Sequence, residues 1–187
     1  MPIRPIVISG DPVLHSVAAP VTDFGPALAE LVADMYETMD AAPGVGLAAP
    51  QIGVPLRVFV YDYPDDDGNE RRGVAVNPEL FITPLEIRDL TEADDEGCLS
   101  FPGERFPLVR AEQAILRAHD IAGKPFEIEC DGWFARIMQH EFDHLNGLLY
   151  VDRLAHLEAK AAEKARKKNG WGKPGLSWMP GVDNLEG

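Results

Sequence analysis

Residues 140–144 read His-Glu-Phe-Asp-His, and this motif constrains the fold of the chain more than any other segment. In an α-helix, residues i and i+4 lie on one face, about 6 Å apart along the axis. Two histidines with this spacing can bind one metal ion, and a glutamate beside the first can act on a nearby water. The motif therefore predicts a helix that carries His140, Glu141 and His144 as a candidate metal site.

The surrounding segments predict an α+β fold. Apolar residues at helical spacing predict a first helix that ends near residue 43: Leu28, Leu31, Val32, Met35 and Met39. Runs of β-forming residues follow at 57–62, 73–77, 85–90, 113–120 and 125–130. We expect the histidine helix over about 131–146 and a helix rich in Ala and Lys over about 153–168. This order, a helix, then strands, then helices, lacks the alternation of a parallel α/β fold.

Composition narrows the class of protein. The chain has 187 residues, enough for one domain, and its 17 positive and 31 negative residues give a net charge of −14. That charge argues against binding DNA over a broad surface. No apolar run approaches the roughly 20 residues that span a bilayer, and the first residues do not resemble a signal peptide. Cys98 and Cys130 are too few for a disulfide scaffold, although counting leaves a bond between them open. We therefore expect an acidic cytoplasmic protein.

Charge is unevenly distributed along the chain. The acidic segment 62–70 contains turn-forming residues and is typical of a solvated hairpin tip. Residues 153–173 carry seven positive side chains and two carboxylates, a net +5, which leaves −19 for the rest. A solvated helix face is the simplest interpretation of this basic segment.

Two histidines make an incomplete metal site, so the third ligand decides its class. A three-histidine protease would have a histidine where this chain has Tyr150. A downstream carboxylate could come from Glu158 or Glu163, but Glu163 lies in the basic helical run. Cys98, in the segment Glu-Gly-Cys-Leu-Ser at 96–100, is the other candidate.

Residues 44–51, Gly-Val-Gly-Leu-Ala-Ala-Pro-Gln, form a third unusual segment. Small residues allow the backbone to approach a ligand closely, and Gln51 offers an amide donor. Taken alone, the segment is more typical of a helix end followed by a turn.

The segments 44–51, 96–100 and 139–144 together resemble the peptide deformylases in order and spacing, and the resemblance covers residues 3–154. It implies an enzyme that removes the formyl group from N-formyl-methionyl nascent peptides. It also implies small antiparallel sheets packed around the helix with the two histidines. Cys98, His140 and His144 would then be the ligands of one divalent metal ion, Fe²⁺ above all, with Zn²⁺, Ni²⁺ or Co²⁺ as alternatives.

The resemblance also suggests roles for other residues. Glu141 would be the general base, and the Gln51 amide and the Leu99 N–H would donate to the developing oxyanion. Further candidates would bind the substrate, its backbone as an added strand and its methionine in a pocket: Val45, Gly46, Gly97, Trp133, Ile137 and Phe142. Two residues depart from the family pattern, Phe101 after the second segment and Arg136 before the third; both positions are usually aliphatic.

The resemblance suggests a division of the chain and a partner. We expect residues 1–170 to form the catalytic domain and residues 171–187 a C-terminal tail. Because the substrate emerges from a ribosome, the basic C-terminal helix could dock on ribosomal RNA despite the net negative charge. An endopeptidase or a non-catalytic metal-binding module on the same scaffold is the alternative function.

Overall fold

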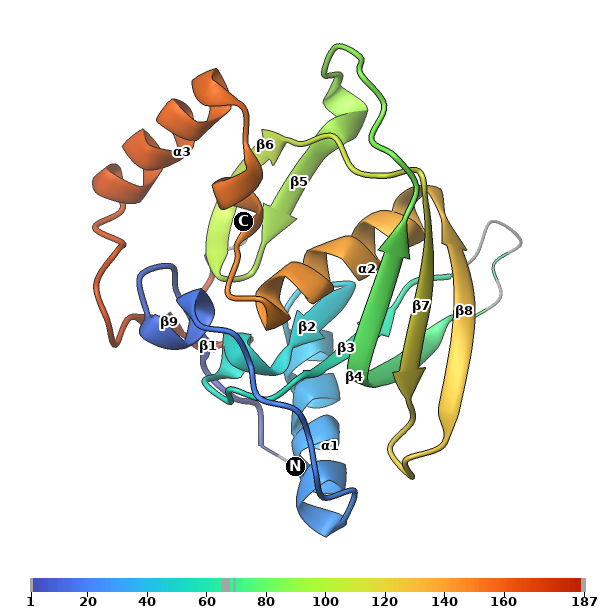
Figure 1. The fold of residues 1–187 in the computed structure, drawn as a ribbon. Helices are drawn as coiled ribbons and strands as arrows, with labels where there is room; N and C mark the ends of the chain where they lie inside the picture. The colour runs from blue at the N-terminus through green and yellow to red at the C-terminus, as the bar shows by residue number, and fades with distance from the viewer. Residues whose placement is uncertain (1, 65–67, 69, 186–187) are drawn as a thin grey trace.

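The computed structural model describes residues 2–64, 68 and 70–185, and places one helix, α2 (Gly132–Leu145), between two antiparallel sheets (Figure 1). The larger sheet has the strand order β2-β3-β4-β7-β8. Its strands are β2 (Gly46–Ala48), β3 (Val58–Asp62), β4 (Arg72–Ile82), β7 (Gln113–His119) and β8 (Pro125–Asp131). The smaller sheet pairs β5 (Asp95–Cys98) with β6 (Phe101–Pro107). This is the α+β architecture that the order of segments predicts.

The larger sheet is covered on both faces at β3, whose successive side chains point in opposite directions. In β3, Val58 and Val60 pack in one core with helix α1 (Pro26–Ala41). Phe59 and Tyr61, between and after them, pack in a second core with α2. The sheet is therefore a wall that fixes α2 from one side.

The smaller sheet closes the other side of α2 and carries the C-terminal helix. A short 3-10 helix, η4 (Tyr150–Arg153), precedes α3 (His156–Lys168). Ala162 and Ala165 of α3 pack with Phe101 and Leu108 in a third core. Three further 3-10 helices lie in connections, η1 (Pro12–His15), η2 (Ala49–Ile52) and η3 (Glu92–Asp94).

The C-terminal tail returns to the domain. Its strand β9 (Ser177–Trp178) pairs with β1 (Ile6–Val7) near the N-terminus. The buried Trp178 indole N–H donates to the Leu99 carbonyl at 2.8 Å, and Trp171 packs edge-on against Phe101. The tail thus contacts the segment that follows Cys98.

Three expectations differ from the structure. The strand expected at 85–90 is wrong, because residues 83–91 form an irregular connection in which Ile87 is fully exposed and no strand of the described ranges pairs with them. The expected strand at 73–77 continues to Ile82 through a bulge between Val76 and Glu79, where Asn77 adopts a φ of +51°. The last helix begins at His156 rather than 153, since the chain first forms η4.

The structure also bears on the acidic segment and on the expectation that no segment spans a membrane. The acidic segment 62–70 connects β3 to β4, but residues 65–67 and 69 lie outside the described residues. None of the helices in the described ranges combines the length and apolar composition needed to span a bilayer.

Candidate metal centre

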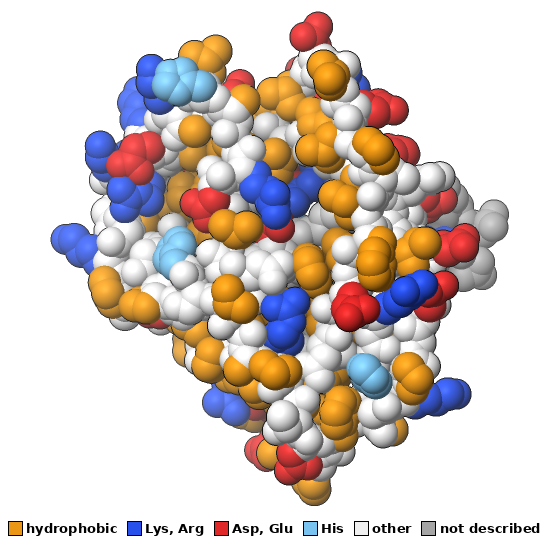
Figure 2. Space-filling view, in the orientation of Figure 1, with side chains coloured by type: hydrophobic (Ala, Val, Ile, Leu, Met, Phe, Trp, Pro, Cys, Tyr) orange, Lys and Arg blue, Asp and Glu red, His pale blue; other side chains and the backbone are white. Residues whose placement is uncertain are grey.

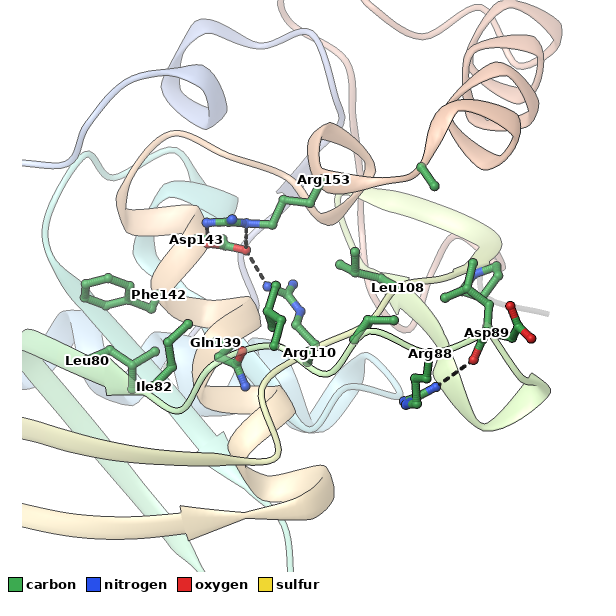
Figure 3. A pocket seen from close by; sticks show the side chains of 15 residues that line it. Leu80, Ile82, Arg88, Asp89, Leu108, Arg110, Gln139, Phe142, Asp143 and Arg153 are labelled. Atoms are coloured by element: carbon green, nitrogen blue, oxygen red, sulfur yellow. Dashed lines mark hydrogen bonds and ion pairs between the residues drawn. The ribbon is translucent and has the colours of Figure 1, made fainter.

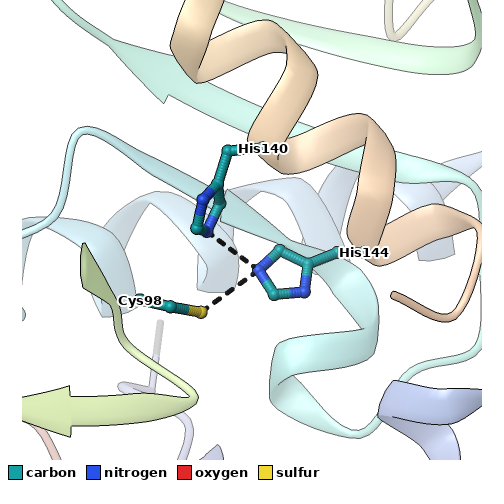
Figure 4. Close-up of side chains that lie close together, drawn as sticks. All are labelled: Cys98, His140 and His144. Carbon is teal, nitrogen blue, oxygen red and sulfur yellow. Dashed lines mark hydrogen bonds between the residues drawn. The ribbon is translucent and has the colours of Figure 1, made fainter. Parts of the chain in front are cut away.

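Three side chains from two elements meet at one point (Figure 4). Cys98 ends β5, and His140 and His144 lie one turn apart on α2. The His144 Nε2 lies 3.4 Å from the Cys98 Sγ and 3.2 Å from the His140 Nε2, and all three donor atoms lie within 4.8 Å of one another. Glu163, the alternative third ligand, instead pairs with Arg166 on α3 at 2.7 Å.

The spacing of these donors suits a metal ion. In a tetrahedral site with zinc-like bond lengths, two imidazole nitrogens would lie about 3.4 Å apart, and a sulfur and a nitrogen about 3.6 Å apart. The observed separations of 3.2 and 3.4 Å are close to these values. Both cysteines are free, so Cys98 forms no bond with Cys130. One soft sulfur and two imidazoles form a donor set for a divalent transition metal.

Glu96 orients the first histidine. Its Oε1 lies 2.6 Å from the His140 Nδ1, an arrangement that turns the Nε2 of the ring towards Cys98 and His144. Two buried arginines hold the same carboxylate: Arg110 donates to both oxygens at 2.6 and 3.1 Å, and Arg136 donates to Oε2 at 2.9 Å. Although burial raises the pKa of Glu96, the His140 hydrogen bond and the Arg110 charge hold that pKa well below its usual range.

The electrostatics of the cluster favour a cation. Burial lowers the pKa of His144 well below 6.5, so its imidazole is neutral and has a lone pair to donate. For His140 burial also lowers the pKa, but Cys98 and Glu96 outweigh this effect and raise it well above 6.5. Cys98 and Glu96 thus favour a positive charge at this ring.

Glu141 faces the same cavity from the next position of the helix. Glu141 is 3% exposed, and its Oε2 has no hydrogen-bond partner among the described residues. Burial raises the pKa of Glu141 to about 7. Glycine at residue 46 leaves room for this carboxylate, because a Cβ there would overlap the Glu141 side chain and displace it. A buried carboxyl with a pKa near neutrality suits a group that takes and returns a proton.

Gln51 and Leu99 approach the cluster from the opposite side. Gln51 lies on η2, where its Oε1 accepts from the Ala48 N–H at 2.8 Å. This bond directs the Gln51 Nε2 towards the Cys98 Sγ, 3.7 Å away, and the Ser100 Oγ, 3.4 Å away. Leu99 follows Cys98 in the turn between β5 and β6. Both residues line the cavity at the cluster.

That cavity has a volume of about 200 Å³ and lies between β2, β5 and α2. It brings together most of the residues expected to bind substrate, namely Val45, Gly46, Gly97, Trp133 and Ile137. Phe142 is an exception. It lines a larger cavity of about 650 Å³ together with Leu80, Ile82 and Gln139 (Figure 3). Phe142 and Gln139 lie three positions apart on α2, so both are on the face of the helix that points away from the metal cluster.

The two departures from the family pattern have different surroundings. Phe101 is 1% exposed and packs against Trp171, so it does not narrow the cavity. Arg136 does line the cavity.

Glu96 and Arg110 are residues to which the sequence analysis assigned no role. Glu96 lies two residues before Cys98 and was therefore identifiable, whereas no local pattern connects Arg110 to the site.

Comparison with known proteins agrees with this geometry. The sequence model of the polypeptide deformylase family matches residues 3–160. The chain belongs to the peptide deformylase family. Its relatives include the peptide deformylases of Rhodococcus opacus, 54% identical over 97% of this chain and 95% of the relative, and of Mycolicibacterium paratuberculosis, 56% identical over 97% and 96%.

Solved deformylases have the same fold. The structure of a peptide deformylase from Legionella pneumophila matches with a TM-score of 0.77 and 42% identity, covering 90% of this chain and 96% of that one. A peptide deformylase from Synechococcus elongatus, solved in complex with actinonin, matches with a TM-score of 0.76 and 36% identity over 89% and 87%.

Peptide deformylases are metalloenzymes of protein biosynthesis, and the Cys-His-His cluster fits that class. The chain is a hydrolase that removes the formyl group from N-formyl-methionyl nascent peptides. A metallopeptidase or a non-catalytic metal-binding module is not favoured.

Proposed function

We propose that Cys98, His140 and His144 hold one divalent metal ion and that Glu141 is the general base of the deformylation. The observation that carries this proposal is the position of Glu141. Its buried carboxylate, with Oε2 unpartnered among the described residues, lines the same cavity as Cys98 and His140.

When bound, the ion polarises the formyl carbonyl and lowers the pKa of a water to about 7. Glu141 takes a proton from the attacking water, whose oxygen bonds to the formyl carbon. Glu141 then delivers that proton to the leaving amine nitrogen as the carbon–nitrogen bond breaks. The products are a free N-terminal amine and formic acid, which loses its remaining proton to solvent as formate, and Glu141 returns to its initial carboxylate state.

Gln51 and Leu99 would stabilise the oxygen that becomes negative in this step. The Gln51 Nε2 is directed to the cluster by the bond between its Oε1 and Ala48, so the donor is in place before the reaction. Val45, Gly46 and Gly97 would bind the peptide backbone. In support, among the strands of the described ranges β2 is at the edge of the larger sheet and β5 pairs with β6 alone, so each has an edge to which a peptide strand could be added.

We propose Fe²⁺ as the ion, since one thiolate and two imidazoles suit late first-row divalent metals. An iron site with an open position reacts with oxygen, and Cys98 is then open to oxidation. The iron-loaded protein should therefore lose activity in air with Cys98 oxidised, whereas a nickel-loaded protein should keep it. Equal lifetimes in air would contradict this assignment.

The reaction is tested by measuring formate release from formyl-Met-Ala-Ser and cleavage of a blocked peptide without a formyl group. The proposed mechanism predicts formate from the first and no cleavage of the second. Internal cleavage of the blocked peptide at a comparable rate would indicate an endopeptidase.

We further propose that α3 contacts the ribosome in the cytoplasm. Lys160, Lys164 and Lys168 are exposed along this helix, and positive side chains gather over it in Figure 2. Lys167 forms an ion pair with Glu163 at 3.2 Å. Screening confines the field of the acidic remainder to about 8 Å at physiological salt, so a local basic surface can bind ribosomal RNA. Residues 1–170 would form the catalytic domain and residues 171–187 its tail.

Co-sedimentation with ribosomes tests this contact. Replacing Lys164, Lys167 and Lys168 by Glu should weaken binding and flatten its salt dependence, with unchanged turnover of a free formyl peptide. Lys124→Glu is the matched control, because Lys124 is exposed between β7 and β8 and far from α3 in sequence. Equal binding of the triple variant and wild type would leave α3 as a solvated face.

A further inference from the structure

A chain of four alternating charges leads from η4 to His140, one of the proposed metal ligands. In order from the surface, its members are Arg153, Asp143, Arg110 and Glu96. The nitrogen–oxygen distance is 2.5 or 2.6 Å at each step, including the last one to the His140 Nδ1. Figure 3 shows the outer half of the chain, where the Asp143 carboxylate lies between the two guanidinium groups.

Exposure falls steeply along this chain. The side chain of Arg153 is 46% exposed, whereas those of the three inner members are only 5–6% exposed. A buried charge is stable when it is paired, so each inner member depends on its neighbours in the chain. Arg153 is thus the surface group that compensates a buried row of charges.

Arg153 determines how Arg110 is shared between two carboxylates. The Nε and Nη2 of Arg153 donate to the two oxygens of Asp143 at 2.6 and 2.5 Å, and the Arg110 Nη1 donates to Oδ2 at 2.6 Å. The Nε and Nη2 of Arg110 donate to Glu96. Without Arg153, Asp143 would keep Arg110 as its one cationic partner among the described residues. The attraction would then draw the Arg110 guanidinium towards Asp143 and away from Glu96.

The Glu96 carboxylate passes such a movement on to the metal ligand. Its Oε1 accepts from the Arg110 Nη2 and contacts the His140 Nδ1, both at 2.6 Å, so a single oxygen joins the guanidinium to the imidazole. Arg136 does not compensate at this oxygen, because its Nη1 donates to Oε2. The partner of Nδ1 sets the direction in which the other ring nitrogen points.

The other end of η4 contacts the same imidazole directly. The ring of Tyr150, the first residue of η4, stacks with that of His140, with centroids 6.1 Å apart and 28° between the planes. Stacking limits the tilt of the imidazole, and the bond to Glu96 sets its direction within the plane. Both ends of η4 therefore act on the ring of His140.

We propose that Arg153 positions the His140 imidazole for metal binding through the three charged residues between them. The inference rests on the proposed function, in which His140 is a ligand of the ion. Arg153 lines the larger cavity and not the cavity at the cluster, so it is a positioning residue rather than a catalytic one. Its loss should loosen the metal site without removing a donor atom.

The test measures how fast Co²⁺ leaves the loaded protein for a chelating dye under anaerobic conditions. Arg153→Met keeps an unbranched apolar side chain but removes the charge and the donors. We expect release about two- to thirtyfold faster than from wild type, the range for substitutions along a coupled network. The visible absorption of bound Co²⁺, which depends on ligand geometry, should also shift. A merely structural role would lower the Tm and leave both metal readouts unchanged.

Arg117→Met is the matched control. Arg117 also pairs with a carboxylate, that of Glu127 at 2.6 Å, and its side chain is 56% exposed. It lies on β7 and outside the chain of charges that ends at His140. Its replacement should leave the release rate and the Co²⁺ absorption at the wild-type values.

A second substitution tests the path. Asp143→Asn removes the charge between Arg153 and Arg110 and should also speed the release of Co²⁺. In that protein the further change Arg153→Met should add little, because the path is already interrupted. Fully additive effects of the two changes would show that Arg153 acts by another route, and the inference would be wrong.

A wild-type release rate in Arg153→Met would likewise overturn the inference. If wild type itself bound no Co²⁺, the proposed metal site would fail, and this inference with it. Because wild type alone decides the second case, the two failures are distinguishable.

Discussion

A substitution of Glu141 tests the proposed general-base role at the scale of one residue. Glu141→Gln keeps the shape of the side chain but removes the group that accepts the proton, and Glu141 is not one of the three donors of the cluster. We expect kcat to fall by about 10²–10⁴-fold, the usual effect of general acid–base catalysis, with the metal content unchanged. Metal analysis and formate release on the same sample measure both. Near-normal turnover would contradict the role of Glu141.

Cys130 provides a pH-dependent prediction. Burial raises its pKa to about 11, so only about a thousandth of this thiol is thiolate at pH 8. In the native protein, alkylation of Cys130 by iodoacetamide should be very slow at pH 8 and should speed up about tenfold per pH unit towards that pKa. Peptide mass spectrometry measures the labelling, with urea-unfolded protein as the control. Equal rates in native and unfolded protein would show that Cys130 is not shielded.

Individual residues of the site were predictable to different degrees. His140 and His144 follow from their spacing, because a helix brings positions i and i+4 together without reference to the rest of the fold. Cys98 lies 46 residues before His144, and its position depends on how β5 packs against α2. The residues alone left Cys98 as one candidate beside Glu158 and Glu163, and the resemblance to the family favoured it as the ligand. Arg110 depends on long-range packing in the same way and was missed.

At the scale of secondary-structure elements, the strands predicted correctly are those whose residue pattern matches the strand that the structure contains. The runs of β-forming residues at 57–62 and 113–120 correspond to β3 and β7, both of which pair with strands on two sides. The apolar segment 85–90 has β-forming residues but no strand to pair with, and Leu85 is 54% exposed. Because pairing partners are distant in sequence, local composition could not reveal their absence. The strands β1, β2, β5, β6 and β9 were missed for the same reason.

A substitution in β9 tests whether the C-terminal tail stabilises the domain and the segment after Cys98. Trp178→Phe keeps an aromatic ring in the core but removes the N–H that donates to the buried Leu99 carbonyl. We expect a loss of about 1–3 kcal/mol in the free energy of unfolding, the usual cost of a buried polar group without its partner. We also expect a lower kcat, since Leu99 adjoins Cys98. Urea denaturation and kinetics measure these effects.

Trp171→Phe is the control for the tail. Trp171 packs against Phe101 but makes no contact of this kind with Leu99, so its replacement should leave kcat close to that of wild type. Equal stability and kcat for Trp178→Phe and wild type would show that the bond to Leu99 is unimportant.

At the scale of the whole molecule, the proposed metal site would connect two parts of the fold. Cys98 belongs to the smaller sheet, and the histidines belong to the helix packed on the larger sheet. A ligand that binds only the native state stabilises it, by about 2.7 kcal/mol at a free concentration 100 times its Kd. Chelation should therefore lower the Tm, which a thermal scan can measure, and added metal should restore it. An unchanged Tm after complete metal removal would contradict this connection.

The α+β class and the central position of α2 were predictable from the order of segments and from the resemblance. The contact of the tail with β1 was beyond local patterns, since it joins residues about 170 positions apart.

Metal content and formate release, measured together on anaerobically purified Cys98→Ala, test the metal site most directly. Cys130→Ala is the matched control, because it removes a buried thiol that lies outside the cluster. Wild type and Cys130→Ala should each bind one divalent ion per chain and release formate from formyl-Met-Ala-Ser, and Cys98→Ala should do neither. A Cys98→Ala protein that keeps one ion per chain and normal turnover would show that Cys98 is not a ligand and that the proposed site is wrong.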